Sequence, residues 1–231
     1  MITITRRGFA ASAVAFAAMP LTARAEDEPA STTTEPQAGA QTGAQGADTA
    51  AGESGAPVVI DFSLGEPDAP VKITEYASFT CPHCADFHAT VWKSLKSEYI
   101  DTGKVHFTLR EVYFDRYGLW AALVARCGGE MRYFGIVDML FDQQGDWATQ
   151  QDPTAVVSKL RTIGLTAGLT NEQLDACLAD AAQVDALVAH FEEGMRKDQV
   201  EGTPTLIIDG EKHPNMTWHD LKAIIDDKLS G

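Results

Sequence analysis

Two hydrophobic periodicities alternate along the chain and predict a sheet with helices packed on it. Apolar residues alternate with polar ones in 71–79 and again in 105–109, a spacing that predicts two strands. From Pro82 to about Tyr99 the apolar positions instead recur every three to four residues, which predicts a helix. The order strand, helix, strand predicts a βαβ unit. A shorter apolar run, Val58–Phe62, predicts another strand ahead of this unit.

Helical spacing replaces the strand pattern from about residue 115 to residue 197. Gly128-Gly129, Gly145-Asp146, Asp152-Pro153 and Gly164 interrupt this stretch, so it predicts several helices. Thr170 and Gln173 have the spacing of a capping box, and the apolar face that begins there predicts one helix as far as Phe191. We therefore expect a helical insertion at about 115–197 within an α/β core.

The strand pattern returns after this insertion. The apolar run 206–208 predicts a strand, and Asp209-Gly210 after it has the composition of a two-residue hairpin turn. Thr217 and Asp220 then have the spacing of a cap at the start of a last amphipathic helix. The complete order is βαβ, helical insertion, ββα, and it predicts an α/β fold.

The first 56 residues lack this alternation. Residues 1–25 have the features of an export signal, with Arg6-Arg7, an Ala-rich apolar stretch and the small-x-small sequence Ala23-Arg24-Ala25. The arginine pair resembles a twin-arginine signal, and an ordinary secretory signal is the alternative. Residues 26–56 contain no Leu, Ile, Val, Phe, Trp or Tyr and predict a disordered linker rather than an oligomerising arm. We therefore expect one exported domain at 57–231.

Charge narrows the classes of partner. Without the three arginines of 1–25 the chain has 15 basic and 33 acidic side chains, a net charge of −18, which disfavours nucleic acid and anionic lipid heads. The apolar part of the signal is shorter than the roughly 20 residues that span a bilayer. We expect an exported, soluble domain.

The candidate chemistry lies where the first long strand meets its helix, in Cys81-Pro82-His83-Cys84. Because proline is tolerated in the first turn, Cys81 falls at the N-cap, where free amides and the helix dipole favour a thiolate. Cysteines at this position have pKa values lowered to roughly 3.5–7.5. Cys84 lies one turn deeper as the resolving thiol, and His83 can stabilise the thiolate. The alternative is a zinc site that includes His88, but structural zinc needs four ligands and no fourth is evident.

Glu75 occupies the apolar register of the strand that precedes these cysteines. In a central strand its carboxylate would be buried, whereas in an edge strand it would reach water. We favour burial because parallel strands are covered on both faces.

Residues 57–231 resemble the thioredoxin superfamily, specifically the DsbA-like thiol:disulfide oxidoreductases of the bacterial cell envelope. The resemblance rests on the Cys81-to-Cys84 motif after a strand, the helical insertion, and Thr203-Pro204 before the penultimate strand. It implies a thioredoxin fold with an inserted helical subdomain. It also implies a periplasmic enzyme that oxidises protein thiols without a cofactor or a metal.

The resemblance assigns a role to each candidate residue. It implies that Cys81 is the nucleophile, Cys84 the resolving thiol and His83 the stabiliser of the thiolate. It further implies a cis-proline at position 204, so that Thr203 and Pro204 face the substrate chain. Glu75 matches the buried acid that serves these enzymes as a proton relay.

Two more cysteines, Cys127 and Cys177, lie fifty residues apart in the predicted insertion. Four cysteines allow three pairings, and local spacing favours Cys81 with Cys84 and Cys127 with Cys177. In an oxidising compartment the second pair is expected to form a structural disulfide. The alternative is two separately buried thiols.

Three functions remain open at this point. The first is a dithiol oxidase that donates its disulfide to unfolded or newly exported proteins and is reoxidised by a membrane partner, as the resemblance implies. The second is a disulfide isomerase or reductase, which usually dimerises; the chain has no segment that resembles a dimerisation domain, so we expect a monomer. The third is a chaperone or binding module in which the CxxC pair only staples the fold.

Overall fold

The computed structural model describes residues 57–231. The predicted export signal at 1–25 and the predicted linker at 26–56 lie outside these residues. Among the described helices, none combines the length and the apolar character needed to cross a membrane.

A five-stranded mixed sheet forms the centre of the described region, in the order β1-β3-β2-β4-β5. Strand β2 (Val71–Ala77) lies in the middle, parallel to β3 (Val105–Glu111) and antiparallel to β4 (Thr205–Ile208). The edges are β1 (Phe62–Leu64), antiparallel to β3, and β5 (Glu211–Pro214), antiparallel to β4. Because β2 has a partner strand on each side and Glu75 is buried in it, the edge-strand alternative for Glu75 is wrong.

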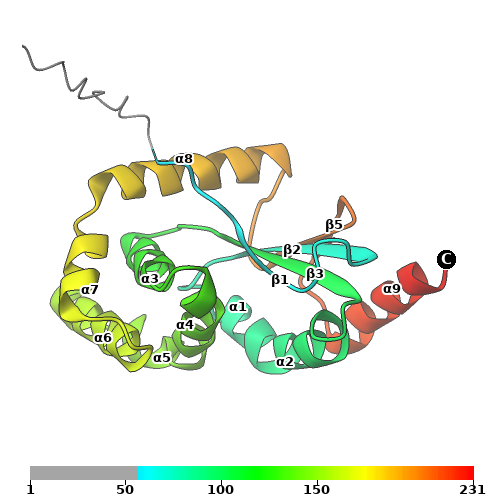
Figure 1. Ribbon diagram of the computed structural model, residues 1–231, viewed down its shortest axis with the longest axis horizontal. Helices are drawn as coiled ribbons and strands as arrows, with labels where there is room; N and C mark the ends of the chain where they lie inside the picture. The colour runs from blue at the N-terminus through cyan, green and yellow to red at the C-terminus, as the bar shows by residue number, and fades with distance from the viewer. Residues whose placement is uncertain (1–56) are drawn as a thin grey trace, which may run out of the picture. The chain divides into compact units, whose positions relative to one another are not determined.

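One continuous helical segment follows β2 and completes the predicted βαβ unit. It consists of α1 (Pro82–Phe87), the π-helical η1 (His88–Trp92), α2 (Lys93–Leu95) and the π-helical η2 (Lys96–Ile100). Together with α9 (Trp218–Ser230), α1 and α2 lie on one side of the sheet, while α8 (Ala181–Lys197) lies on the other (Figure 1). The sequence therefore predicted the extent of the helix but not its two wider π turns.

The helical insertion is confirmed between β3 and β4. Besides α8 it contains α3 (Arg116–Cys127), α4 (Glu130–Asp142), α5 (Gln144–Trp147), α6 (Pro153–Thr166) and α7 (Asn171–Leu178). It shares one hydrophobic core with the sheet, because the Trp92 ring lies 4.7 Å from the ring of Phe107 in β3 and 6.1 Å from that of Phe134 in α4. The insertion is thus packed onto the helical segment that follows β2.

Two predicted elements need correction. The strand predicted at Val58–Phe62 begins only at Phe62, since Val58 and Ile60 are 87% and 67% exposed. The single helix predicted from Thr170 to Phe191 is two helices, α7 and α8. The break occurs at 179–180 because the Asp180 carboxylate accepts a hydrogen bond from the Gln183 amide and so starts a new helix. The hairpin turn at Asp209-Gly210 is confirmed, with φ of 48° and 86°.

Candidate functional site

Cys81 is the N-cap of α1, directly after the central strand, and it is partly exposed. A hydrogen bond with the Cys84 thiol is the largest cause that lowers the pKa of Cys81, from the ordinary 9.0 to about 5. The Thr203 side chain and the backbone amides of His83 and Cys84 lower this pKa further, against the effect of burial. The free amides of the first turn therefore act as the N-cap position predicts.

Cys84 has the opposite environment, although it lies only three residues further on. It is 0% exposed, and burial is the largest of several causes that raise its pKa well above the ordinary value. The neighbouring Cys81 and the charge of Glu75 raise this pKa further. At neutral pH the site therefore holds one thiolate at the surface and one thiol in the core. When the two sulfurs are joined in a disulfide, such a pair can accept attack at Cys81 and release Cys84 inward.

Thr203 and Pro204 lie beside the exposed sulfur, as the resemblance implies. The Thr203-Pro204 bond is cis, and the Cys81 Sγ lies 3.4 Å from the Thr203 carbonyl oxygen. The His83 side chain is exposed, and its backbone amide is the group that contributes to the lowered pKa of Cys81. The site is thus a partly exposed sulfur bordered by a backbone segment that could meet a bound peptide.

Glu75 and His88 form a buried pair beneath the cysteines. Glu75 is 0% exposed and pairs across the sheet with Leu109 and Leu206. His88, in η1, is 3% exposed, and its Nε2 lies 3.2 Å from Glu75 Oε2. The sequence had suggested His88 only as a candidate zinc ligand. Its position on the face of Cys84, together with the register of Glu75, was the signal that could have predicted the pair.

Gln144 is a second site residue that the sequence argument missed. From α5, its side-chain amide donates hydrogen bonds to the backbone carbonyls of Phe79 and Cys81, at 2.8 and 2.9 Å. It therefore holds the loop between β2 and α1 in position. No local pattern marks it, because the partners lie more than sixty residues away along the chain.

Metal binding was the alternative for this motif. In residues 57–231, no group of three or more His, Cys, Asp or Glu side chains is arranged to hold a metal ion. Cys81, Cys84 and His88 do lie on one helical segment, but the Nε2 of His88 faces Glu75 instead. The donor set fits a dithiol centre better than a structural zinc site.

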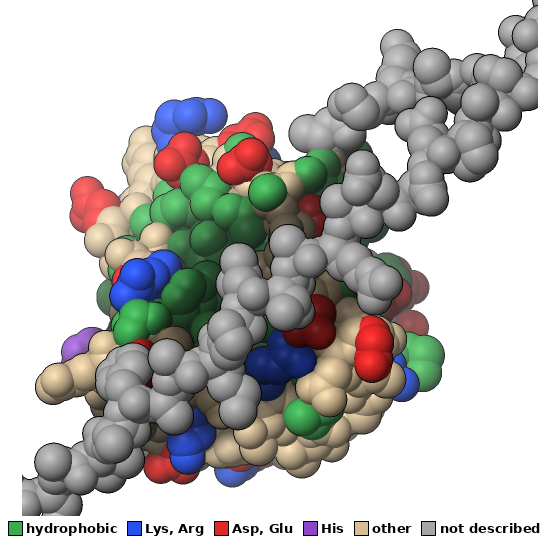
Figure 2. Space-filling model, turned by 90° about the vertical axis from the view of Figure 1, so that its left-hand side faces the viewer, with side chains coloured by type: hydrophobic (Ala, Val, Ile, Leu, Met, Phe, Trp, Pro, Cys, Tyr) green, Lys and Arg blue, Asp and Glu red, His purple; other side chains and the backbone are tan. Residues whose placement is uncertain are grey.

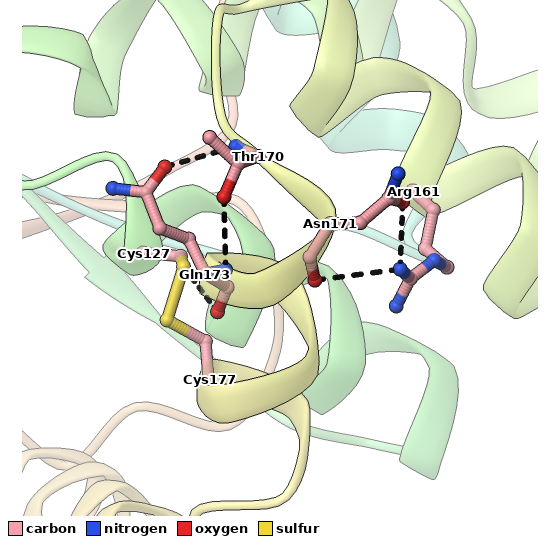
Figure 3. Close-up of a disulfide and its surroundings, with 6 residues drawn as sticks. All are labelled: Cys127, Arg161, Thr170, Asn171, Gln173 and Cys177. Carbon is pink, nitrogen blue, oxygen red and sulfur yellow. Dashed lines mark hydrogen bonds between the residues drawn. A yellow bond between two sulfur atoms is a disulfide. The ribbon is translucent and has the colours of Figure 1, made fainter.

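Cys127 and Cys177 are joined by a disulfide that links the end of α3 to α7 (Figure 3). The S–S distance is 2.16 Å and the Cα–Cα distance 5.8 Å. Next to it, Thr170 and Gln173 form the capping box that starts α7, with each side chain accepting a hydrogen bond from the other residue's backbone amide. The disulfide thus fastens a helix whose first turn is already fixed by its own sequence.

The same disulfide borders a mainly apolar cavity of about 300 Å³. Its wall includes the segment 58–60, Phe62, Leu123 and both cysteines. Figure 2 views the molecule from the end at which α6 and α7 lie and shows hydrophobic side chains gathered on this face. Neither Cys81 nor Cys84 lines this cavity, so it is separate from the dithiol centre.

The fold and the site define a thioredoxin-fold protein with a dithiol centre at the start of a helix. The chain belongs to the thioredoxin family: the sequence model of the family described as "Thioredoxin" matches residues 58–227. The predicted resemblance to DsbA-like proteins is confirmed by the comparisons with individual proteins.

Three proteins illustrate this similarity. A Rickettsia bellii protein named as a candidate protein-disulfide oxidoreductase is 32% identical over 167 residues, which are 72% of this chain and 63% of that protein. The crystal structure of Wolbachia pipientis alpha-DsbA1 has a TM-score of 0.70 at 27% identity, over 75% of this chain and 93% of that one. A structure described as a protein-disulfide isomerase from Novosphingobium aromaticivorans has a TM-score of 0.66 at 26% identity, over 74% of this chain and 98% of that one.

Proposed function

We propose that this protein is a DsbA-type protein-disulfide oxidoreductase that works as a dithiol oxidase. The observation that carries the proposal is the contrast between the two sulfurs, because Cys81 is held as a partly exposed thiolate and Cys84 as a buried thiol. A stable thiolate favours the reduced form of the protein. The disulfide form is correspondingly a strong oxidant.

The reaction follows from this contrast. A substrate thiolate attacks Sγ of Cys81, the bond to Cys84 breaks, and Cys84 leaves with the electron pair and takes up a proton. A second substrate thiolate then attacks the substrate sulfur of the mixed disulfide, and Cys81 leaves as a thiolate. The substrate has lost two electrons and gained a disulfide, and the enzyme has gained two electrons.

Each neighbouring residue has a proposed role in this scheme. Thr203 and Pro204 present their backbone to the substrate chain, which is supported by the contact of the Thr203 carbonyl with Cys81. His83 stabilises the Cys81 thiolate, and its amide already contributes to the lowered pKa of Cys81. We assign to Glu75 the proton-relay role of the buried acid in the resembling family; burial and, in addition, its negative charge raise the pKa of the Cys84 thiol and so favour the protonated form of that sulfur. Cys127 and Cys177 serve as a structural disulfide.

The setting is part of the proposal. Export by the signal at 1–25, a linker at 26–56 and a catalytic domain at 57–231 would place the site in the periplasm, where newly exported proteins are its substrates. A membrane protein would then remove the two electrons, and the enzyme would act as a monomer. The chain spans 63% of the length of the Rickettsia relative.

The reduction potential of the pair Cys81 and Cys84 tests the oxidase against its main alternative. Isomerase activity is the second candidate because a similar structure is described as a protein-disulfide isomerase. The potential is measured by equilibrating the protein, with Cys127 and Cys177 replaced by alanine, in glutathione buffers and counting alkylated thiols by mass spectrometry. We expect a value more positive than about −180 mV, and a more negative value contradicts the oxidase.

A further inference from the structure

The segment that carries Thr203 and Pro204 lies beside the reactive sulfur. Residues 198–204 join α8 to β4 and belong to neither a helix nor a strand. The Thr203 carbonyl oxygen lies 3.4 Å from Cys81 Sγ, so the position of this segment decides where a bound substrate chain would meet the sulfur. Because no ladder of strand hydrogen bonds fixes the segment, side chains of neighbouring elements have to hold it in place.

Tyr76 of β2 contacts the chain on both sides of this segment. Its backbone pairs with Thr205 in the antiparallel ladder of β2 and β4. Its hydroxyl donates a hydrogen bond of 2.6 Å to Oδ2 of Asp198, the residue that ends α8. Since β2 leads on to Cys81, one residue ties both ends of the segment to the strand that precedes the reactive sulfur.

Arg110 of β3 completes a polar cluster around this hydrogen bond. Its Nη1 donates to the Tyr76 hydroxyl oxygen at 2.8 Å and to Asp198 Oδ2 at 3.2 Å. Its Nε donates to Asp61 Oδ2 at 2.8 Å, and Asp61 Oδ1 lies 2.7 Å from Nε2 of His190 in α8. Burial, and then the bond to Asp198, raise the pKa of Tyr76 to about 12, so its hydroxyl remains a donor at neutral pH. The cluster thus fastens α8 to the sheet at two points.

The last turn of α8 also packs closely on Tyr76. The backbone amide of Val200 donates to the Met195 carbonyl oxygen at 2.9 Å, and Gln199 between them has the left-handed φ, 51°, of a Schellman motif. Val200 is buried in the same small apolar cluster as Tyr76. A Cβ atom at Gly194 would lie only 3.1 Å from the Tyr76 hydroxyl oxygen, so this glycine allows the close approach of α8 to the sheet. The chain therefore leaves α8 in a fixed direction.

We propose that Tyr76 and Asp198 are positioning residues for polypeptide substrates, because their hydrogen bond holds the Thr203-Pro204 segment against Cys81. The inference rests on the proposed function, in which that segment presents its backbone to the substrate chain. A substrate chain that uses this backbone binds better when the backbone is already fixed, since ordering it on binding would cost free energy. A small dithiol needs only the exposed sulfur of Cys81. The cluster therefore favours polypeptide thiols over small thiols.

The test compares two reductants of the disulfide of Cys81 and Cys84, a synthetic peptide with a pair of cysteines and dithiothreitol. Each second-order rate constant is measured by acid quench, alkylation and mass spectrometry of the alkylated Cys81. Tyr76→Phe keeps the ring but loses the hydroxyl, so the peptide rate constant should fall about tenfold while that of dithiothreitol stays within about twofold. Asp198→Asn keeps an oxygen that can accept from Tyr76 and should retain most of the peptide rate, whereas Asp198→Ala should lose as much as Tyr76→Phe.

Tyr99 offers a matched control, because its hydroxyl also lies between a carboxylate and a cation. It donates to Asp226 and accepts from Lys222 Nζ at 2.6 Å. These bonds tie η2 to α9, at the far end of the helical segment that starts beside Cys81. Tyr99→Phe therefore breaks a similar cluster without touching residues 198–204, and it should leave the ratio of the two rate constants unchanged.

Amide hydrogen exchange supplies a readout that does not involve catalysis. Exchange in residues 199–203, measured by mass spectrometry, should become faster in Tyr76→Phe but not in Tyr99→Phe. An unchanged ratio of rate constants or unchanged exchange in Tyr76→Phe overturns the proposal, and so does an equal fall of the ratio in Tyr99→Phe. If Tyr76→Phe does not fold, Asp198→Ala decides in its place. Both measurements apply equally to an oxidase or a reductase, and the reduction potential decides between these separately, so the two proposals can fail independently.

Discussion

The two cysteine pairs of this protein have opposite relations to their helices. Cys81 precedes the first turn of α1, at the positive end of the helix dipole, whereas Cys127 is the last residue of α3 and Cys177 is next to last in α7. A thiolate is stabilised at the first position and disfavoured at the other two. Position along a helix therefore separates a reactive sulfur from sulfurs that only cross-link.

The pairs also differ in what they connect. Cys81 and Cys84 lie within one turn, so a bond between them constrains almost no chain. The bond between Cys127 and Cys177 spans a sequence separation of 50 and joins two helices of the insertion. Loop-closure entropy predicts a large effect on stability for the second bond and a small one for the first. We therefore propose redox chemistry for the first pair and a stabilising role for the second.

The largest expected effect is the loss of activity in Cys81→Ser. Without the attacked sulfur no mixed disulfide forms, and oxidation of a reduced substrate protein should stop. The Cys127→Ala/Cys177→Ala variant should keep most of its activity when assayed at a temperature where it is folded. The oxidase activity of each variant is measured by how fast a reduced, inactive test enzyme regains its own activity. If Cys81→Ser still oxidises the substrate protein, or if the Cys127→Ala/Cys177→Ala variant no longer does, the proposed roles of the two pairs are wrong.

Second in size is the effect of pH on the reduced form. Because the pKa of Cys81 is lowered from 9.0 to about 5, the thiolate stabilises the fold fully above pH 9, where the unfolded chain is also ionised. As the pH falls from 9 to 5 the unfolded chain takes up a proton first, and this stabilisation is lost. The free energy of unfolding of the reduced wild type, measured with urea, should therefore fall toward pH 5 relative to that of Cys81→Ser. Thiolate absorbance at 240 nm should show a midpoint near pH 5, and a midpoint above 8 would contradict the N-cap argument.

Third is the stability supplied by the disulfide of the insertion. Cys127→Ala/Cys177→Ala should lower the free energy of unfolding by about 3–4 kcal/mol, because the unfolded chain gains the freedom of a long loop. Urea denaturation of wild type and variant, both with Cys81 and Cys84 oxidised, measures the difference. The matched comparison is Cys84→Ala, judged against wild type with that pair reduced. If removal of the long-range disulfide costs nothing, its structural role is wrong.

The smallest expected effect is that of Gln144→Ala. This change removes two hydrogen bonds to backbone carbonyls of the active-site loop, and we expect a loss of roughly 1–3 kcal/mol in unfolding free energy. The pKa of Cys81 should also rise, since the first turn of α1 is held less firmly. Gln143→Ala, its exposed neighbour, is the control. A Gln144→Ala protein with the same stability and the same Cys81 pKa would mean that the insertion does not support the site.

Much of the dithiol site could be predicted from local sequence. The change of period from two to about three and a half located the end of β2 and the start of α1, and Pro82 placed Cys81 at the N-cap. The register of the strand also predicted that Glu75 is buried, because an acidic residue stood where apolar ones were expected. The capping box at Thr170 was found in the same way, but the end of α7 was not. The apolar face of α7 continues into α8, and the helix break depends on the Asp180 cap.

The sequence by itself was enough to predict Cys81 as the reactive sulfur, because N-capping and helix position are properties of adjacent residues. Only the tertiary structure decided which groups surround it. Gln144 reaches the active-site loop from the insertion, and the contact of His88 with Glu75 joins a helix to the central strand. Such contacts depend on how the insertion and the sheet share one core, and no periodicity along the chain records that packing.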